Sequence, residues 1–231
     1  MKLISSWSGG KDSCLALYKA IQKGYEISIL LNFISEEYKR CCFHGVSSEL
    51  MNMQAEALEI PIFQKSVPAD MVEYENQFKF AVNEIKVKWK IQGMIFGDIY
   101  LEEHKSWVDR VCNDLKVIPI EPLWDLTAEK VVKEFIDTGF KAIVISAKAD
   151  TFDEDFLGRE VDYEMISEIK KMNVCPCGEN GEFHTFVYDG PIFKKKITIF
   201  ETEKILKEGF WRHWFLDIKK YKIEQKYSHG A

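Results

Sequence analysis

The chain has 231 residues, of which 46% are hydrophobic and 29% charged, and its formal net charge is −6. This length suffices for one sizeable core, the hydrophobic content excludes a disordered chain, and the acidic balance argues against extended nucleic-acid binding. No apolar stretch approaches membrane-spanning length, no signal peptide precedes the first predicted strand, and the six cysteines are irregularly spaced. We therefore expect a cytoplasmic protein with reduced thiols.

The first predicted element is a strand over residues 3–7, which runs directly into the loop Ser8-Gly9-Gly10-Lys11-Asp12-Ser13. The two glycines remove the Cβ atoms that would keep a phosphate off the backbone. Apolar residues then recur at helical spacing over residues 14–21, so the loop opens a helix whose positive dipole end faces the ligand. Lys11 is expected to add a mobile positive charge.

This loop differs from a Walker A loop, in which a hydroxyl residue follows the lysine, because here Asp12 follows it. The alternative is a glycine-rich turn without a ligand. Such a turn explains neither the lysine nor its position just behind a strand, so the loop predicts a nucleotide-phosphate site.

Strands and helices continue to alternate through the first two thirds of the chain. The predicted strands cover residues 27–33, 62–63, 93–98, 117–120 and 141–146, and the predicted helices cover residues 47–58, 69–90, 108–115 and 127–138. This order predicts a three-layer α/β domain with a doubly wound, mainly parallel sheet and ligands at the carboxyl ends of its strands. Gly97, Asp98 and Ser146 should therefore lie on the same rim as the phosphate loop.

The pattern changes beyond about residue 147. An acidic loop over residues 150–159 is followed by a predicted helix over 163–171 and by predicted strands over 183–187 and 195–200. We expect a small α+β domain that closes over the nucleotide rim, so that residues 1–147 and 148–231 form two domains. Residues 228–231 are expected to be frayed.

Two segments carry a family resemblance. The phosphate loop resembles the SGGxDS loop of the PP-loop ATP pyrophosphatases, whose fold is of the adenine nucleotide alpha-hydrolase-like type. Together with the segment Gly-Glu-Asn-Gly-Glu-Phe-His-Thr over residues 178–185, it makes the whole chain similar to the diphthine–ammonia ligases, particularly the short archaeal forms. The Pro-Leu-Trp over residues 122–124 and the Leu-Gly-Arg over residues 157–159 fit the same pattern.

The resemblance implies a particular reaction. Such enzymes use ATP and ammonium to convert the carboxylate of diphthine, on translation elongation factor 2, to the amide of diphthamide. An acyl-adenylate forms with release of pyrophosphate, and ammonia then displaces AMP. The implied cofactors are ATP and Mg²⁺, and the implied partners are elongation factor 2 and ammonium.

The nucleotide side of the reaction is expected to use the loop and the rim of the sheet. The candidate ATP-binding residues are Ser8, Gly9, Gly10, Lys11, Asp12, Ser13, Gly97 and Asp98. Lys11 would neutralise the departing pyrophosphate, and Asp12 or Asp98 would hold Mg²⁺, which takes one or two carboxylates plus phosphate oxygens. The alternative for Asp12 is a charge that only stabilises the helix N-terminus.

The acceptor side is expected to use the second segment and nearby rings. The candidates are Trp124, Arg159, Glu179, Asn180, Gly181, Glu182, His184 and Thr185. Glu179 or Glu182 could bind ammonium and then accept its proton. The trimethylammonium of diphthine suits aromatic faces and diffuse negative charge, for which Trp124, Phe183 and residues 153–155 are candidates. Trp124 could instead belong to the core, residues 153–155 to a solvated loop, and His184 to an ordinary strand.

The cysteines allow a different interpretation. A metal or redox centre could be formed by Cys175 and Cys177 with His184, or by Cys41 and Cys42 with His44. Some PP-loop enzymes also thiolate tRNA through persulfide cysteines. Neither spacing matches common zinc sites, and a tRNA modifier usually needs a basic face. A sulfur-transfer enzyme is therefore the alternative, and a non-catalytic nucleotide-binding module is a more remote one. The sequence leaves the oligomeric state open, including a homo-oligomer.

Overall fold

The structure is a computed structural model that describes residues 1–42, 44–208 and 212–226. The first part of the chain contains β1 (Lys2–Ser6), α1 (Lys11–Gln22), β2 (Glu26–Ser35), α2 (Ser48–Leu58), β3 (Ile62–Val67), α3 (Met71–Trp89), β4 (Gly93–Ile95), α4 (Glu102–Leu115), β5 (Ile118–Ile120) and α5 (Ala128–Asp137). The remainder contains β6 (Lys141–Lys148), the 3₁₀ turn η1 (Glu154–Phe156), α6 (Tyr163–Lys171), β7 (Phe183–Asp189), β8 (Lys195–Lys207) and β9 (His213–Gln225). The predicted frayed tail over residues 228–231 lies outside the described residues.

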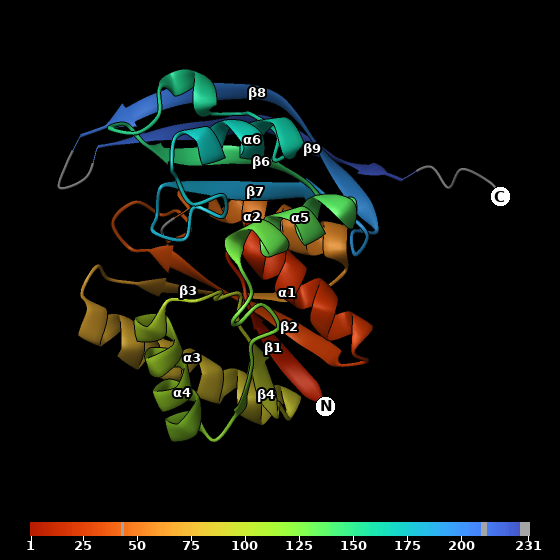
Figure 1. The fold of residues 1–231 in the computed structure, drawn as a ribbon. Coiled ribbons are helices and arrows are strands. Elements are labelled where there is room, and N and C mark those ends of the chain that lie inside the picture. The colour runs from red at the N-terminus through yellow and green to blue at the C-terminus, as the bar shows by residue number, and fades with distance from the viewer. Residues whose placement is uncertain (43, 209–211, 227–231) are drawn as a thin grey trace.

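The first sheet is parallel, with the strand order β3-β2-β1-β4-β5 (Figure 1). Alternate residues of its central strand face opposite layers: Leu3 joins the hydrophobic core that includes α1, α2 and α5, whereas Ile4 joins the core that includes α3 and α4. This arrangement confirms the predicted three-layer α/β fold. It also places the loops after β2 and β4 on either side of the phosphate loop, because β1 pairs with both strands.

The second sheet is antiparallel, with the strand order β7-β6-β9-β8. The prediction that residues 141–146 close the parallel sheet is therefore wrong, and Ser146 lies opposite His184 of β7 instead of on the rim of the first sheet. The strand is buried from Val144 to Ala147. A continuous buried run of this kind looks alike in a central parallel strand and in a covered antiparallel one, so periodicity could not distinguish them.

Strand β9 was not predicted from the sequence. A short period-two signal was present, since Leu216 and Ile218 alternate with Asp217 and Lys219. Pairing of β9 with β8 and β6 decides its conformation. The division into domains of residues 1–147 and 148–231 stays a prediction.

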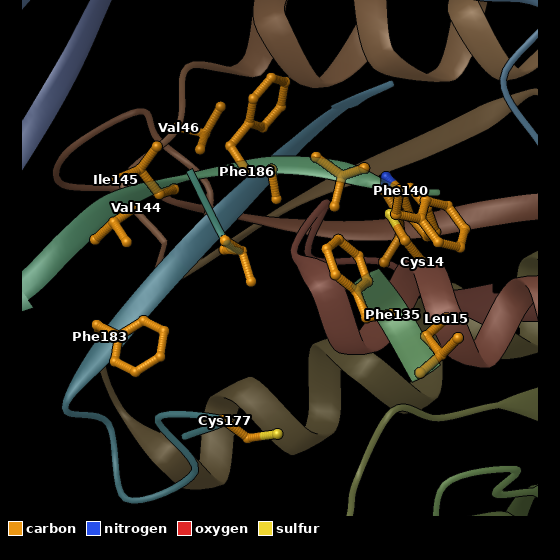
Figure 2. Close-up of a cluster of buried hydrophobic side chains, with 14 of the residues drawn as sticks. Cys14, Leu15, Val46, Phe135, Phe140, Val144, Ile145, Cys177, Phe183 and Phe186 are labelled. Carbon is orange, nitrogen blue, oxygen red and sulfur yellow. The ribbon is translucent and has the colours of Figure 1, made fainter. Parts of the chain in front are cut away.

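The second sheet packs on the layer formed by α1, α2 and α5 (Figure 1). Helix α6 lies beside α5, since Tyr163 donates to Asp137 and Lys170 pairs with Glu129. Figure 2 shows one cluster that contains Cys14 of α1, Phe135 of α5, Val144 of β6 and Phe186 of β7. The core is thus shared between the two sheets. Within the described ranges, no helix is both long and apolar enough to cross a membrane.

Candidate nucleotide and acceptor site

The phosphate loop is held in place by close backbone contacts. Gly9 has a φ of +76°, and a Cβ added there would lie 2.6 Å from Oε1 of Gln54. A Cβ added to Gly10 would lie 3.0 Å from Nε2 of His44. Both glycines are required by these approaches. Helix α1 begins at Lys11 and has no side-chain N-cap, so its positive end opens onto the loop.

Strand β7 of the second sheet clamps this loop. Val187 N donates to the carbonyl of Gly9 at 3.0 Å, and Lys11 N donates to Oγ1 of Thr185 at 3.1 Å. The buried Gln54 donates to the carbonyls of both Gly9 and Val187 and accepts from the indole N–H of Trp7 at 2.9 Å. Thr185 is therefore brought to the loop, and Gln54 is a positioning residue that the sequence reasoning missed.

The side chain of Lys11 is only 3% exposed. Its Nζ donates to Oδ2 of Asp12 at 2.8 Å and to the carbonyl of Cys177, and it lies 5.6 Å from the ring centroid of Phe183. The expectation of a mobile lysine is thus wrong, because these partners hold the ammonium group. Burial acts to lower the pKa of Lys11, but the Asp12 carboxylate, together with Cys177 and Glu179, outweighs burial and the pKa is raised. The group remains charged at neutral pH.

Asp12 and Asp98 face the same region from two different elements. A Cβ on Gly97 would lie 3.0 Å from backbone atoms of Asp12 and Ser13, so this glycine lets the end of β4 approach the start of α1. Burial raises the pKa of Asp12; Lys11 opposes the shift and Asp98 adds to it. Oδ1 of Asp12 is buried without a hydrogen-bond partner in the described part of the chain. An unpartnered carboxylate oxygen beside a second carboxylate fits a cation.

The two candidate carboxylates on the acceptor side have different surroundings. Oε1 of Glu179 accepts from Ile99 N at 3.4 Å, and burial together with the charge of Asp12 raises the pKa of Glu179 to about 7, against the opposing effect of Lys11. Glu182 instead accepts from the backbone and side-chain N–H groups of Asn180, each at 3.0 Å. Glu179 therefore has the pKa expected of a base that works near neutrality.

His184 lies against the ring of His44, which the sequence indicated only as part of a possible cysteine–histidine centre. The rings of His44 and His184 are 4.6 Å apart between centroids. Burial lowers the pKa of His44 to about 4 and that of His184 well below its usual range. Both imidazoles are thus neutral at pH 7. The position of His44 in the loop after β2 was the available signal, since ligands gather at the carboxyl ends of parallel strands.

The candidates Trp124, Arg159 and Gly181 make contacts with other parts of the protein. The Lys105 ammonium lies 5.8 Å from the ring centroid of Trp124, and Arg159 forms an ion pair with Glu168 of α6. Gly181 closes the turn by donating its N–H to the carbonyl of Gly178 at 2.9 Å. Substrate roles for Trp124, Arg159, Asn180 and Gly181 stay predictions.

The cysteines lie in packed surroundings. Cys177 donates to the carbonyl of Ala128 at 3.1 Å, and burial raises the pKa of its thiol. Burial raises the pKa of Cys41 to about 12. Among the described residues, no group of three or more His, Cys, Asp or Glu side chains is arranged to hold a metal ion. Because reactive cysteines need a lowered pKa, these surroundings do not favour a persulfide site.

Comparisons with known proteins agree across nearly the whole chain. Residues 1–119 match the family model described as "Diphthamide synthase N-terminal domain", and residues 127–224 match "Diphthamide synthase C-terminal domain". The diphthine–ammonia ligase of Mus musculus is 28% identical over 99% of this chain and 94% of its own length, and that of Danio rerio is 28% identical over 98% of each. A solved Methanocaldococcus jannaschii structure, titled as a predicted subunit of tRNA methyltransferase, has 17% identity and a TM-score of 0.46 and covers 83% of this chain and 98% of its own.

Proposed function

The chain belongs to the diphthamide synthase family, and we propose that it amidates the diphthine residue of translation elongation factor 2 with ammonium and ATP. It is an ATP-dependent carbon–nitrogen ligase that acts in the last step of diphthamide biosynthesis. AMP and pyrophosphate are the proposed products of ATP.

One observation carries the proposal: a fixed cation and a carboxylate poised near neutral pH share one site. Lys11 belongs to the phosphate loop, whereas Glu179 comes from the turn before β7. The charges of Asp12 and Lys11 act on Glu179 in opposite directions, so the three groups are electrostatic neighbours. The arrangement supports a nucleotide end and an ammonia end within a single site.

In the first step, a carboxylate oxygen of diphthine attacks the α-phosphorus of ATP and pyrophosphate leaves. The loop N–H groups and Lys11 stabilise the charge that develops on the pyrophosphate. Asp12 and Asp98 would hold Mg²⁺, which supplies further neutralisation of the phosphate charge when bound.

In the second step, the nitrogen of ammonia attacks the acyl carbon and AMP leaves. Glu179 in its carboxylate form binds the incoming ammonium and takes one of its protons, which frees the lone pair for attack. Glu182 remains a candidate for binding the acceptor. Neutral His184 and His44 flank the loop on the β2 side and are available as neutral hydrogen-bonding groups.

The direct test uses diphthine-bearing elongation factor 2, ATP, Mg²⁺ and ammonium. Mass spectrometry should show that the modified peptide loses about one dalton, and a charge-sensitive separation should show the loss of one negative charge at neutral pH. AMP and pyrophosphate should appear in equal amounts. Conversion of ATP to ADP, or no change in the peptide, would refute the proposal.

The sulfur-transfer alternative is not favoured. Both family models and the curated relatives are diphthamide enzymes, and the cysteine surroundings give it no support. Thiolation of tRNA in a parallel assay would be needed to revive it. The cytoplasmic location and a homo-oligomeric state remain proposals; the first agrees with a substrate that acts in translation.

A further inference from the structure

Tyr100 presents an aromatic ring beside the carboxylates of the site. It is 38% exposed and follows Ile99, whose N–H is bonded to Glu179. Its hydroxyl lies 3.2 Å from the sulfur of Cys175, a contact that fixes the ring at one end. In the described part of the chain, no lysine or arginine lies over this ring. The face is therefore available to a cation from outside the protein.

The carboxylates of Glu179 and Glu182 lie near the ring of Tyr100. Burial and the contact with Cys175 raise the pKa of Tyr100, and the charges of Glu179 and Glu182 add to the shift. Asp98, two residues earlier in the chain, is held by His104 at 2.9 Å. Two carboxylates, Glu179 and Glu182, thus lie near one exposed aromatic ring, and such a surface favours a cation over the phosphates of a nucleotide.

The side of the phosphate loop next to β2 carries histidine and lysine side chains. The loop after β2 contributes His44, whose ring lies tilted against that of His184. Lys148, at the end of β6, helps to lower the pKa of His184, and its Nζ donates to the carbonyl of Asn180 at 2.8 Å. These groups are neutral or positive at pH 7. Glu179 lies near the end of β4, where it accepts from Ile99 N, whereas Lys148 lies beside the turn that carries Glu182.

The other aromatic rings considered from the sequence are less suited to bind an external cation. The ring of Phe183 is 2% exposed and already faces Lys11, and the ring of Trp124 already faces Lys105. A quaternary ammonium cannot donate a conventional hydrogen bond, so an open aromatic face with nearby negative charge is what would recognise it. Tyr100 combines an exposed aromatic ring with nearby carboxylates.

We propose that Tyr100, with Glu179 and Glu182, forms the subsite that binds the trimethylammonium group of the acceptor. This inference rests on the proposed function, because diphthine carries its trimethylammonium and its reacting carboxylate on one side chain. The cation must then lie close to the carboxylate that is activated beside Lys11. Tyr100 is thus a specificity-determining residue that binds the cation and takes no part in bond formation.

The first experiment compares Tyr100→Phe and Tyr100→Leu in the full chain. Phenylalanine retains the aromatic face, so its KM for diphthine-bearing elongation factor 2 should stay within about 3-fold of the wild type. Leucine removes the face, so its KM should rise by roughly 3- to 30-fold while the KM for ATP stays unchanged. Tyr163→Leu, which removes an exposed tyrosine of α6, is the matched control and should change neither. Equal losses in the Phe and Leu variants would overturn the subsite, since the hydroxyl contact would then be what matters.

A second experiment does not depend on the acceptor protein. Choline binding to the full chain is followed by saturation transfer to its N-methyl protons, with its neutral isostere 3,3-dimethyl-1-butanol as the control ligand. The wild type and Tyr100→Phe should bind the cation, and Tyr100→Leu should lose most of the signal. Equal signals from the cation and its neutral isostere, or an unchanged signal in Tyr100→Leu, would overturn the inference. Cation binding by a wild-type protein that fails to amidate elongation factor 2 would refute the proposed function alone.

Discussion

The groups around Lys11 fix the position of its ammonium group. Asp12 and the carbonyl of Cys177 hold its ammonium group, and the lysine itself is buried. A cation that is already oriented needs no rearrangement when charge develops on a leaving group, which is the main advantage of a preorganised site.

Lys11→Ala should therefore reduce acceptor-dependent pyrophosphate release by roughly 100-fold or more. The loss should appear in turnover, measured by a coupled pyrophosphate assay at saturating ATP. Lys19→Ala, on the surface of the same helix where Lys19 pairs with Glu134, is the control and should retain activity. A wild-type rate in Lys11→Ala would contradict the assignment of the phosphate loop.

Glu179 leads to a prediction about pH. Its pKa is raised to about 7, so the carboxylate form that can accept a proton dominates only above that pH. The rate of amide formation should rise as the pH increases through about 7. Glu179→Gln should lower the rate by roughly 100-fold or more and remove this inflection, leaving a profile that follows the fraction of free ammonia.

The control for Glu179 is Glu182→Gln, because Glu182 lies in the same turn but is bonded to Asn180. Its pH profile should retain the inflection near 7. Rates are measured by mass spectrometry of the acceptor peptide, with ATP affinity determined separately. An inflection that persists in Glu179→Gln but disappears in Glu182→Gln would reverse the two assignments.

At the scale of elements, β7 links the second sheet to the phosphate loop. The contacts from Val187 and Thr185 position the loop backbone, and Gln54 of α2 joins β1, the loop and β7 through its single amide. The loop therefore depends on three elements that are far apart in the sequence.

Gln54→Leu tests this dependence. It removes the acceptor of the buried indole N–H of Trp7 and the Gln54 donor to the carbonyls of Gly9 and Val187, so the free energy of unfolding should fall by about 2–3 kcal/mol. Urea denaturation provides the measurement. Asn52→Ala, on the exposed face of α2, should change it by less than about 0.5 kcal/mol. A comparable loss in both variants would show that the bridge is not the cause.

At the scale of the whole molecule, the two sheets share one hydrophobic core. Residues of α1 and α5 pack with residues of β6 and β7, so neither sheet can lose its partner without exposing this core (Figure 2). The candidate site lies where the loop after β1 meets β7, so its geometry depends on the same packing.

Unfolding should therefore be a single cooperative transition. Tryptophan fluorescence and far-ultraviolet circular dichroism should give the same midpoint, because the cluster connects both halves. Phe186→Ala, at a fully buried position of β7, should lower that midpoint for both probes, with a loss of about 3–5 kcal/mol. Two separated transitions in the wild type would show that the halves unfold independently.

The sequence by itself determined the features that depend on neighbouring residues. The strand-to-helix turn over residues 8–13, the helix over 163–171 and the helix starts at Ser47 and Thr127 follow from glycine, capping residues and periodicity, and the structure confirms them. The family also followed from short motifs, because such motifs consist of contiguous residues.

Only the tertiary structure decided which elements meet. The sheet to which β6 belongs, the existence of β9 and the contact of His44 with His184 arise from pairing between distant segments. The tertiary structure also decided the fixed position of Lys11 and the raised pKa of Glu179, because desolvation and neighbouring charge set a pKa. A residue's burial and neighbours depend on long-range packing, and local sequence patterns do not contain that information.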